Sequence, residues 1–158
     1  MKPFEEKPKL CLITLGCKAN QYDSSALLGY LSDHFILVAP GPENPADIYI
    51  INTCTVTHRA DFDARQLSRR AQKWNPSAKI VIAGCLAKNP EGLKENKSSL
   101  LFNAGERDKL LRELIRIEPE IRNDIFYHPR GGLQFRSRAL VKVQEGCNYR
   151  CSYCIVPY

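Results

Sequence analysis

The stretch DIYIINTCTVTHRADFDARQLSRRAQKWNPSAKIVIAGC, residues 47–85, decides the fold of this chain. Its apolar start predicts a buried strand over 47–53, the middle has the three-and-four spacing of an amphipathic helix, and 79–83 is again an apolar strand. A strand, a helix and a further strand in this order predict a parallel βαβ unit. A cysteine follows the end of each strand closely: Cys54 comes directly after the first, and Cys85 comes two residues after the second.

The same alternation continues on both sides of this unit. Further strands are expected at 9–16, 35–39 and 100–105, and a helix from Arg107. Asp23 or Ser24 is expected to cap the helix after the first strand. The pattern predicts an α/β doubly wound domain with a flavodoxin-like parallel sheet of about five strands, in the order 2-1-3-4-5.

Three parts of the chain are expected. Residues 8–118 form the α/β domain, residues 119–137 are a linker rich in proline and glycine, and residues 138–158 begin a second domain. A strand is predicted at 138–146, directly before three closely spaced cysteines.

Composition narrows the functional classes. With 44% apolar and 25% charged residues, the chain is typical of a globular protein, and it lacks an apolar run near the roughly 20 residues that span a bilayer. The first ten residues lack the apolar core of a secretory signal, so we expect a cytoplasmic protein. Seven cysteines in that compartment indicate metal or redox chemistry rather than a disulfide framework. A net charge of +6 permits a polyanionic partner such as nucleic acid.

Cys147, Cys151 and Cys154 have the spacing C-x3-C-x2-C. Three thiolates so close together can hold an iron–sulfur cluster and leave one iron open to substrate. A zinc site completed by a distant ligand, or cysteines that are simply buried, are the alternatives.

Cys17, Cys54 and Cys85 are distant in sequence, but each follows the carboxyl end of a predicted strand. These ends lie at one edge of a parallel sheet, so the order 2-1-3-4-5 would bring the three cysteines together. Gly16 and Gly84 precede two of them and would let the backbone approach a cluster. Buried structural cysteines are the alternative for each residue taken alone.

Other residues receive simpler interpretations. Cys11 lies inside the first strand and is assigned to the core. The three histidines, none with a second ligand at metal spacing, are expected to be surface or polar-contact residues: His34, His58 and His128. Two basic groups could contact RNA or simply face solvent, one on the predicted helix (Arg65, Arg69, Arg70, Lys73) and one near the final cysteines (Arg130, Arg136, Arg138, Lys142, Arg150).

The segment GCNYRCSYC at 146–154 resembles the signature of the radical S-adenosylmethionine superfamily, C-x3-C-x-aromatic-C. Together with LGCKANQYDS, INTCTVTHRAD and VIAGCLAKNP, it is similar to the methylthiotransferase family of these enzymes over nearly the whole chain. The first two segments most resemble the branch that acts on N6-threonylcarbamoyladenosine next to the tRNA anticodon. Other branches act on isopentenyladenosine in tRNA or on a ribosomal protein.

This resemblance implies two 4Fe-4S clusters and S-adenosylmethionine as cofactors. Cys147, Cys151 and Cys154 would hold the cluster that binds S-adenosylmethionine, and a second cluster with the sulfur to be inserted would be held by Cys17, Cys54 and Cys85. The implied partners are tRNA, modified at carbon 2 of the adenine, and an electron donor such as flavodoxin or ferredoxin. By the same resemblance the chain is an amino-terminal piece, expected not to complete catalysis alone.

Two hypotheses from other classes remain at this point. An electron-transfer or thiol-redox module would show a reversible redox couple without binding S-adenosylmethionine. A zinc-stabilised RNA-binding module would contain zinc, and its affinity for tRNA would fall steeply with salt.

Overall fold

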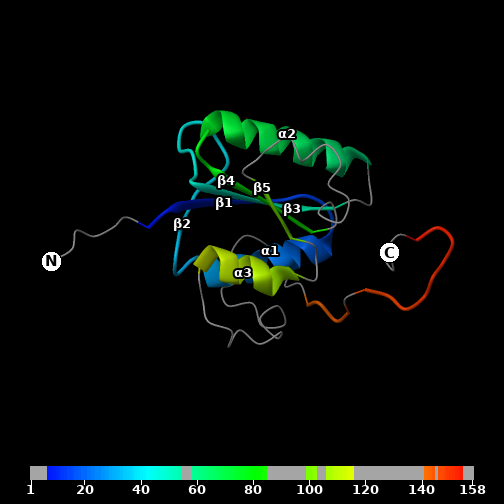
Figure 1. The fold of residues 1–158 in the computed structure, drawn as a ribbon. Coiled ribbons are helices and arrows are strands. Elements are labelled where there is room, and N and C mark those ends of the chain that lie inside the picture. Colours follow the sequence, from blue (N-terminus) through cyan, green and yellow to red (C-terminus); the bar gives the residue numbers. More distant parts are fainter. Residues whose placement is uncertain are drawn as a thin grey trace.

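The computed structural model describes residues 7–54, 58–84, 99–102, 106–115, 141–144 and 146–154. Its centre is a parallel sheet of five strands in the order β2-β1-β3-β4-β5, as the sequence predicts (Figure 1). The strands are β1 (Lys9–Thr14), β2 (Ile36–Leu37), β3 (Ile48–Thr53), β4 (Lys79–Gly84) and β5 (Ser99–Phe102). The helices are α1 (Lys18–Leu31), α2 (His58–Trp74) and α3 (Arg107–Ile115).

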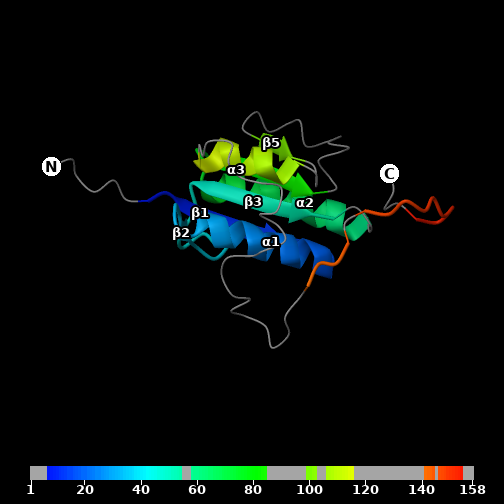
Figure 2. The same ribbon diagram turned by 90° about the horizontal axis from the view of Figure 1, so that it is seen from below.

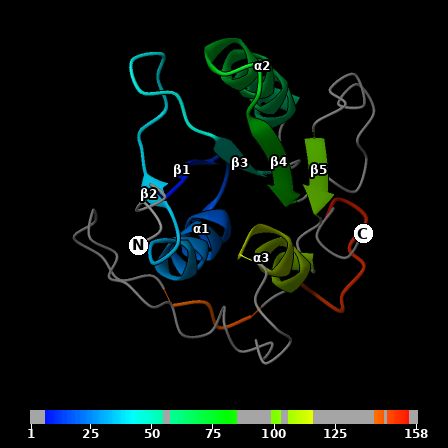
Figure 3. The same ribbon diagram turned by 60° about the vertical axis from the view of Figure 1, so that its left-hand side comes forward.

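Helices cover both faces of the sheet. Helices α1 and α3 pack on one face and α2 packs on the other, which the end-on view shows most clearly (Figure 3). Alternate strand residues point to opposite faces. Leu10, Ile50 and Val81 therefore join α1 and α3 in one buried cluster, whereas Cys11 and Ile51 join α2 in the other. Both faces being buried explains why the central strands are almost entirely apolar.

The predicted apolar stripe of α2 is confirmed where its side chains are described. Ala64 and Ala71 are fully buried, and Leu67 and Trp74 pack against the same cluster. The rings of Trp74 and Tyr49 lie 6.0 Å apart. Arg69, Arg70 and Lys73 are exposed on the opposite side of the helix, as a solvated face requires.

Strands β1, β3 and β4 end level with one another. Thr14 pairs with Asn52, and Thr53 pairs with Gly84. Their carboxyl ends therefore form one edge, from which the segments leading to α1 and α2 leave the sheet. We call this the carboxyl edge; it is also where α1 begins.

Neither Asp23 nor Ser24 caps α1, because the helix begins at Lys18 with Cys17 as its N-cap, and both residues are buried inside it. Residues 141–144 of the strand predicted at 138–146 are not a strand; backbone groups need a neighbouring strand to pair with, and these residues pair with none in the described part of the chain. The linker, 119–137, lies outside the described residues.

No helix in the described part of the chain combines the length and the apolar character needed to cross a membrane.

Candidate metal centre at the carboxyl edge

Cys17 and Cys54 follow two neighbouring strands at the carboxyl edge. The two strand ends are joined by the backbone N–H of Leu15, which donates to the carbonyl of Asn52 at 2.8 Å. Cys17 is exposed and is the N-cap of α1, whereas Cys54 is only 5% exposed. One accessible and one buried thiol are thus presented at the same edge.

Gly16 brings these two cysteines together. It has a φ of +112°, a conformation that residues with a side chain rarely adopt. A Cβ on Gly16 would overlap the Cβ of Cys54 and lie 3.1 Å from its Sγ. The backbone immediately before Cys17 therefore rests directly on the side chain of Cys54, which is possible only because this residue is glycine.

Gly84 makes a similar close backbone contact between β4 and β3. Its φ is +92°, and a Cβ there would overlap the carbonyl oxygen of Thr53 and lie 3.0 Å from Oδ1 of Asn52. The last residue of β4 is thus packed on the residue that precedes Cys54. Cys85 follows Gly84 in the sequence but lies outside the described residues.

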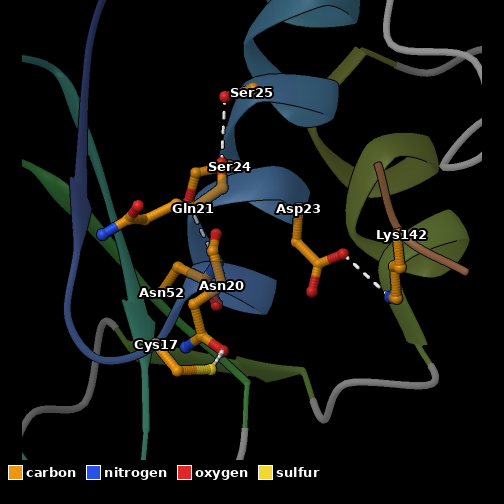
Figure 4. A network of polar contacts seen from close by, with 8 residues as sticks. All are labelled: Cys17, Asn20, Gln21, Asp23, Ser24, Ser25, Asn52 and Lys142. Atoms are coloured by element: carbon orange, nitrogen blue, oxygen red, sulfur yellow. Dashed lines mark hydrogen bonds and ion pairs between the residues drawn. The ribbon is translucent and has the colours of Figure 1, made fainter. Parts of the chain in front are cut away.

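Asn20 on α1 ties the two cysteine-bearing turns to each other. Its Nδ2 donates to the carbonyl of Leu15 at 3.0 Å and to the carbonyl of Thr53 at 2.7 Å. Its Oδ1 faces Sγ of Cys17 at 3.7 Å, within the longer range of a thiol donor. One buried amide therefore contacts the chain on both sides of the edge, and Figure 4 shows its contact with Cys17.

A second layer of polar contacts holds α1 on the sheet. Nδ2 of Asn52 donates to the carbonyl of Asn20 at 3.1 Å and to Oγ of Ser24 at 3.0 Å, and the Thr14 hydroxyl donates to the same Oγ at 2.7 Å. On the far side, the Thr53 hydroxyl donates to the carbonyl of Ala83 at 2.8 Å. Buried polar groups satisfied in this way fix one arrangement of the edge.

Cys11 shows what a purely structural cysteine looks like in this fold. It is fully buried in β1, and burial raises the pKa of its thiol to about 11. A thiol so hard to ionise is a poor ligand or nucleophile. Its assignment to the core is confirmed by its burial.

The final three cysteines lie in a different setting. Cys151 is exposed, and Cys147 and Cys154 are half-buried. The backbone N–H of Cys154 donates to the carbonyl of Cys151 at 3.1 Å in a tight turn. Among the described residues, no three Cys, His, Asp or Glu side chains are gathered closely enough to hold a metal ion. Both ligand sets therefore remain predictions, the first because Cys85 is outside the described part of the chain.

The chemistry of the carboxyl edge fits an iron–sulfur cluster. Thiolates are the usual protein ligands of such clusters. Two cysteines lie at this edge beside glycine backbone, where missing side chains leave room for close approach. Cys17 is at a helix N-terminus, whose partial positive charge favours an anionic group. Cys17 and Cys54 are the described residues that could hold the cluster.

Sequence reasoning missed the polar residues around these cysteines. Asn20, Ser24, Leu27 and Leu31 are spaced by four, three and four residues, so they share one helical face. Leu27 and Leu31 mark that face as buried, and the two polar residues must therefore be buried with them. This helical spacing is enough to predict that Asn20 and Ser24 are buried. It does not predict the groups that they contact, because those contacts depend on where β3 lies.

The fold and this edge define a parallel α/β domain that presents cysteines beyond its strand ends. The model of the family described as "Uncharacterized protein family UPF0004" matches residues 9–103, and the chain belongs to this family.

Curated relatives of the chain are named for one type of reaction. A protein of Chlamydia pneumoniae named "Threonylcarbamoyladenosine tRNA methylthiotransferase MtaB" is 37% identical over all of this chain, and one of the same name from Bacillus subtilis (strain 168) is 34% identical over 92% of it. A "Ribosomal protein uS12 methylthiotransferase RimO" of Xanthomonas oryzae pv. oryzae (strain PXO99A) is 31% identical over 99% of the chain. The chain spans 37%, 35% and 35% of the lengths of these three relatives. The resemblance to methylthiotransferases is thus confirmed.

Proposed function

We propose that this chain carries the sulfur-handling domain of a radical S-adenosylmethionine methylthiotransferase that modifies tRNA. The observation that carries the proposal is the contact of Gly16 with the side chain of Cys54, which brings two predicted ligands to one edge. The names of the curated relatives supply the reaction class.

Cys17, Cys54 and Cys85 hold the first 4Fe-4S cluster in this proposal. The exposed Cys17 would bind it from the solvent side and the buried Cys54 from the domain side. Asn20 and the two glycines keep the turns in place, so that the thiolates are positioned before iron arrives.

Cys147, Cys151 and Cys154 hold the second 4Fe-4S cluster, which binds S-adenosylmethionine. When bound, the two clusters and S-adenosylmethionine would supply a radical able to activate a C–H bond, a sulfur and a methyl group. The exposure of Cys151 and Tyr153 leaves this segment accessible for a cofactor.

The substrate of the whole protein is proposed to be N6-threonylcarbamoyladenosine in tRNA, modified at carbon 2 of the adenine. Four relatives with 34–37% identity are named for that nucleoside, and those named for the ribosomal protein are 31% identical. The reaction needs an electron donor, for which a flavodoxin or ferredoxin is suitable. The reduced thiols it requires are maintained in the cytoplasm, where we place the protein.

Anaerobic reconstitution with iron and sulfide tests the ligand assignment. The Cys54→Ala chain should retain about half the iron of the wild-type chain, because one of two clusters is lost. Cys11→Ala, which removes a buried cysteine away from the edge, should retain all of it. Iron analysis and electron paramagnetic resonance measure both. Equal iron in the two variants, or uptake of zinc in preference to iron, would overturn the proposal.

A further inference from the structure

A buried ion pair joins the start of the chain to the segment that leads to the final cysteines. Nζ of Lys142 lies 3.0 Å from Oδ1 of Asp23, and the two residues are 119 positions apart. Their side chains are only 6% and 5% exposed. By comparison, the Lys79–Glu113 pair has the same length of 3.0 Å, but its side chains are 36% and 52% exposed.

Asp23 lies on a helix that side-chain hydrogen bonds hold to the sheet. It lies on α1, the helix that begins directly after Cys17, and its neighbour Ser24 is hydrogen-bonded to Thr14 and Asn52 on the sheet. Figure 4 shows the Asp23 carboxylate pointing from α1 towards Lys142. The carboxylate is therefore a fixed point relative to the carboxyl edge.

Lys142 is the inward-facing residue of its segment. Val141 and Val143, on either side of it, are 79% and 91% exposed. A strongly exposed valine on each side of a buried lysine is the reverse of ordinary packing. These two valines bury little apolar surface, whereas Lys142 between them turns inward and makes the ion pair with Asp23.

The segment that contains Lys142 leads directly to the second cysteine set. Five residues after Lys142 comes Cys147. In Figures 1 and 2 residues 146–154 lie on the side of the molecule towards which the carboxyl ends of the strands point. The ion pair thus holds the second cysteine set on the same side as Cys17 and Cys54.

We infer that the Asp23–Lys142 pair is a positioning contact that fixes the approach of the second cysteine set to the first. This inference rests on the proposed function for its purpose, because it concerns the spacing of two metal centres. The contact itself is a property of the described chain. A buried charge without its partner is strongly unfavourable, so removing either side chain should release the segment.

Amine labelling of the full 158-residue chain tests the contact without any cofactor. In the wild-type chain Lys142 should react with an acylating reagent at least roughly tenfold more slowly than Lys109, whose side chain is 62% exposed. Equal rates would overturn the inference whatever the variants do.

The Asp23→Asn variant should raise the labelling rate of Lys142 to near that of Lys109. Glu113→Gln is the matched control, since it removes the carboxylate of an equally short but exposed pair and should leave Lys142 protected. Asp23→Glu should restore most of the protection. Continued slow alkylation of Cys54 in the same samples shows that the domain is folded. A protected Lys142 in folded Asp23→Asn would contradict the contact.

Electron paramagnetic resonance of the reconstituted, reduced chain tests the positioning role. Lys142→Met should keep the wild-type iron content but lose or change the magnetic interaction between the two clusters. An unchanged interaction in Lys142→Met would overturn the positioning role. If no clusters assemble in the wild-type chain, the proposed function fails while the labelling result still decides the contact.

Discussion

The two cysteine-bearing regions of the molecule are held by different means. At the carboxyl edge, paired strand ends, close-packed glycines and buried amides hold Cys17 and Cys54. The second cysteine set lies on a segment without regular secondary structure, described at 146–154, and its lead-in at 141–144 is attached through Lys142. The first site depends on long-range topology, and the second depends on close spacing in the sequence. Substitutions at the first edge should therefore damage the fold, and those at the second should not.

Gly16→Ala should cause the largest loss of stability among the substitutions that test this difference. The added Cβ would overlap Cys54 and the positive φ would be strained, so we expect a loss of about 3 kcal/mol in the free energy of unfolding. Gly146→Ala is the matched control, since Gly146 has a positive φ of +73° with nothing within 4 Å of the new Cβ, and it should cost only the backbone term of about 1 kcal/mol. Urea unfolding measures both. Similar losses of stability in the two variants would contradict the difference between the carboxyl edge and the second cysteine set.

Asn20→Ala should cause the second largest loss of stability. It leaves the buried carbonyls of Leu15 and Thr53 without their amide donor, at a cost of about 2 kcal/mol. Asn44→Ala is the control, because Asn44 accepts its hydrogen bond from Lys9 at an exposed site and should change stability by less than about 0.5 kcal/mol. If Asn20→Ala were as stable as Asn44→Ala in urea, the polar network would not be what holds the edge.

Alkaline pH should destabilise the domain through the buried thiol of Cys11. Burial raises the pKa of Cys11 from 9.0 to about 11. Below pH 9 its thiol is neutral in both states, and as pH rises from 9 to 11 it ionises in the unfolded chain first, so about 2 kcal/mol of stability is lost. Urea midpoints across this range should fall less steeply in Cys11→Ala than in the wild-type chain. The same slope in both would show that Cys11 is not the titrating group.

Glu113→Gln should have the smallest effect. The Lys79–Glu113 pair lies at the start of β4, away from the carboxyl edge, and both side chains are exposed. Exposed ion pairs contribute little, so the free energy of unfolding should change by less than about 0.5 kcal/mol. A loss above about 1 kcal/mol would mean that this part of the surface contributes more than its exposure suggests.

The sequence predicts most of the fold because its signals are local or periodic. The apolar runs of β1, β3 and β4 predict a parallel sheet, and the shared edge for Cys17 and Cys54 follows once the strand order is correct. The start of α1 was predicted wrongly because Asp23 and Ser24 are common cap residues, whereas here they make buried contacts with distant groups. A contact between residues 119 positions apart leaves no local pattern to find.

Iron retention in a chain without the second cysteine set tests most directly whether the strand ends build a metal centre. The Cys147→Ala, Cys151→Ala, Cys154→Ala triple variant, reconstituted anaerobically, should still bind one 4Fe-4S cluster. Adding Cys17→Ala, Cys54→Ala or Cys85→Ala, one at a time, should abolish that binding or sharply weaken it. A triple variant that retains no cluster, or a cluster unaffected by all three further substitutions, would contradict the centre proposed at the carboxyl edge.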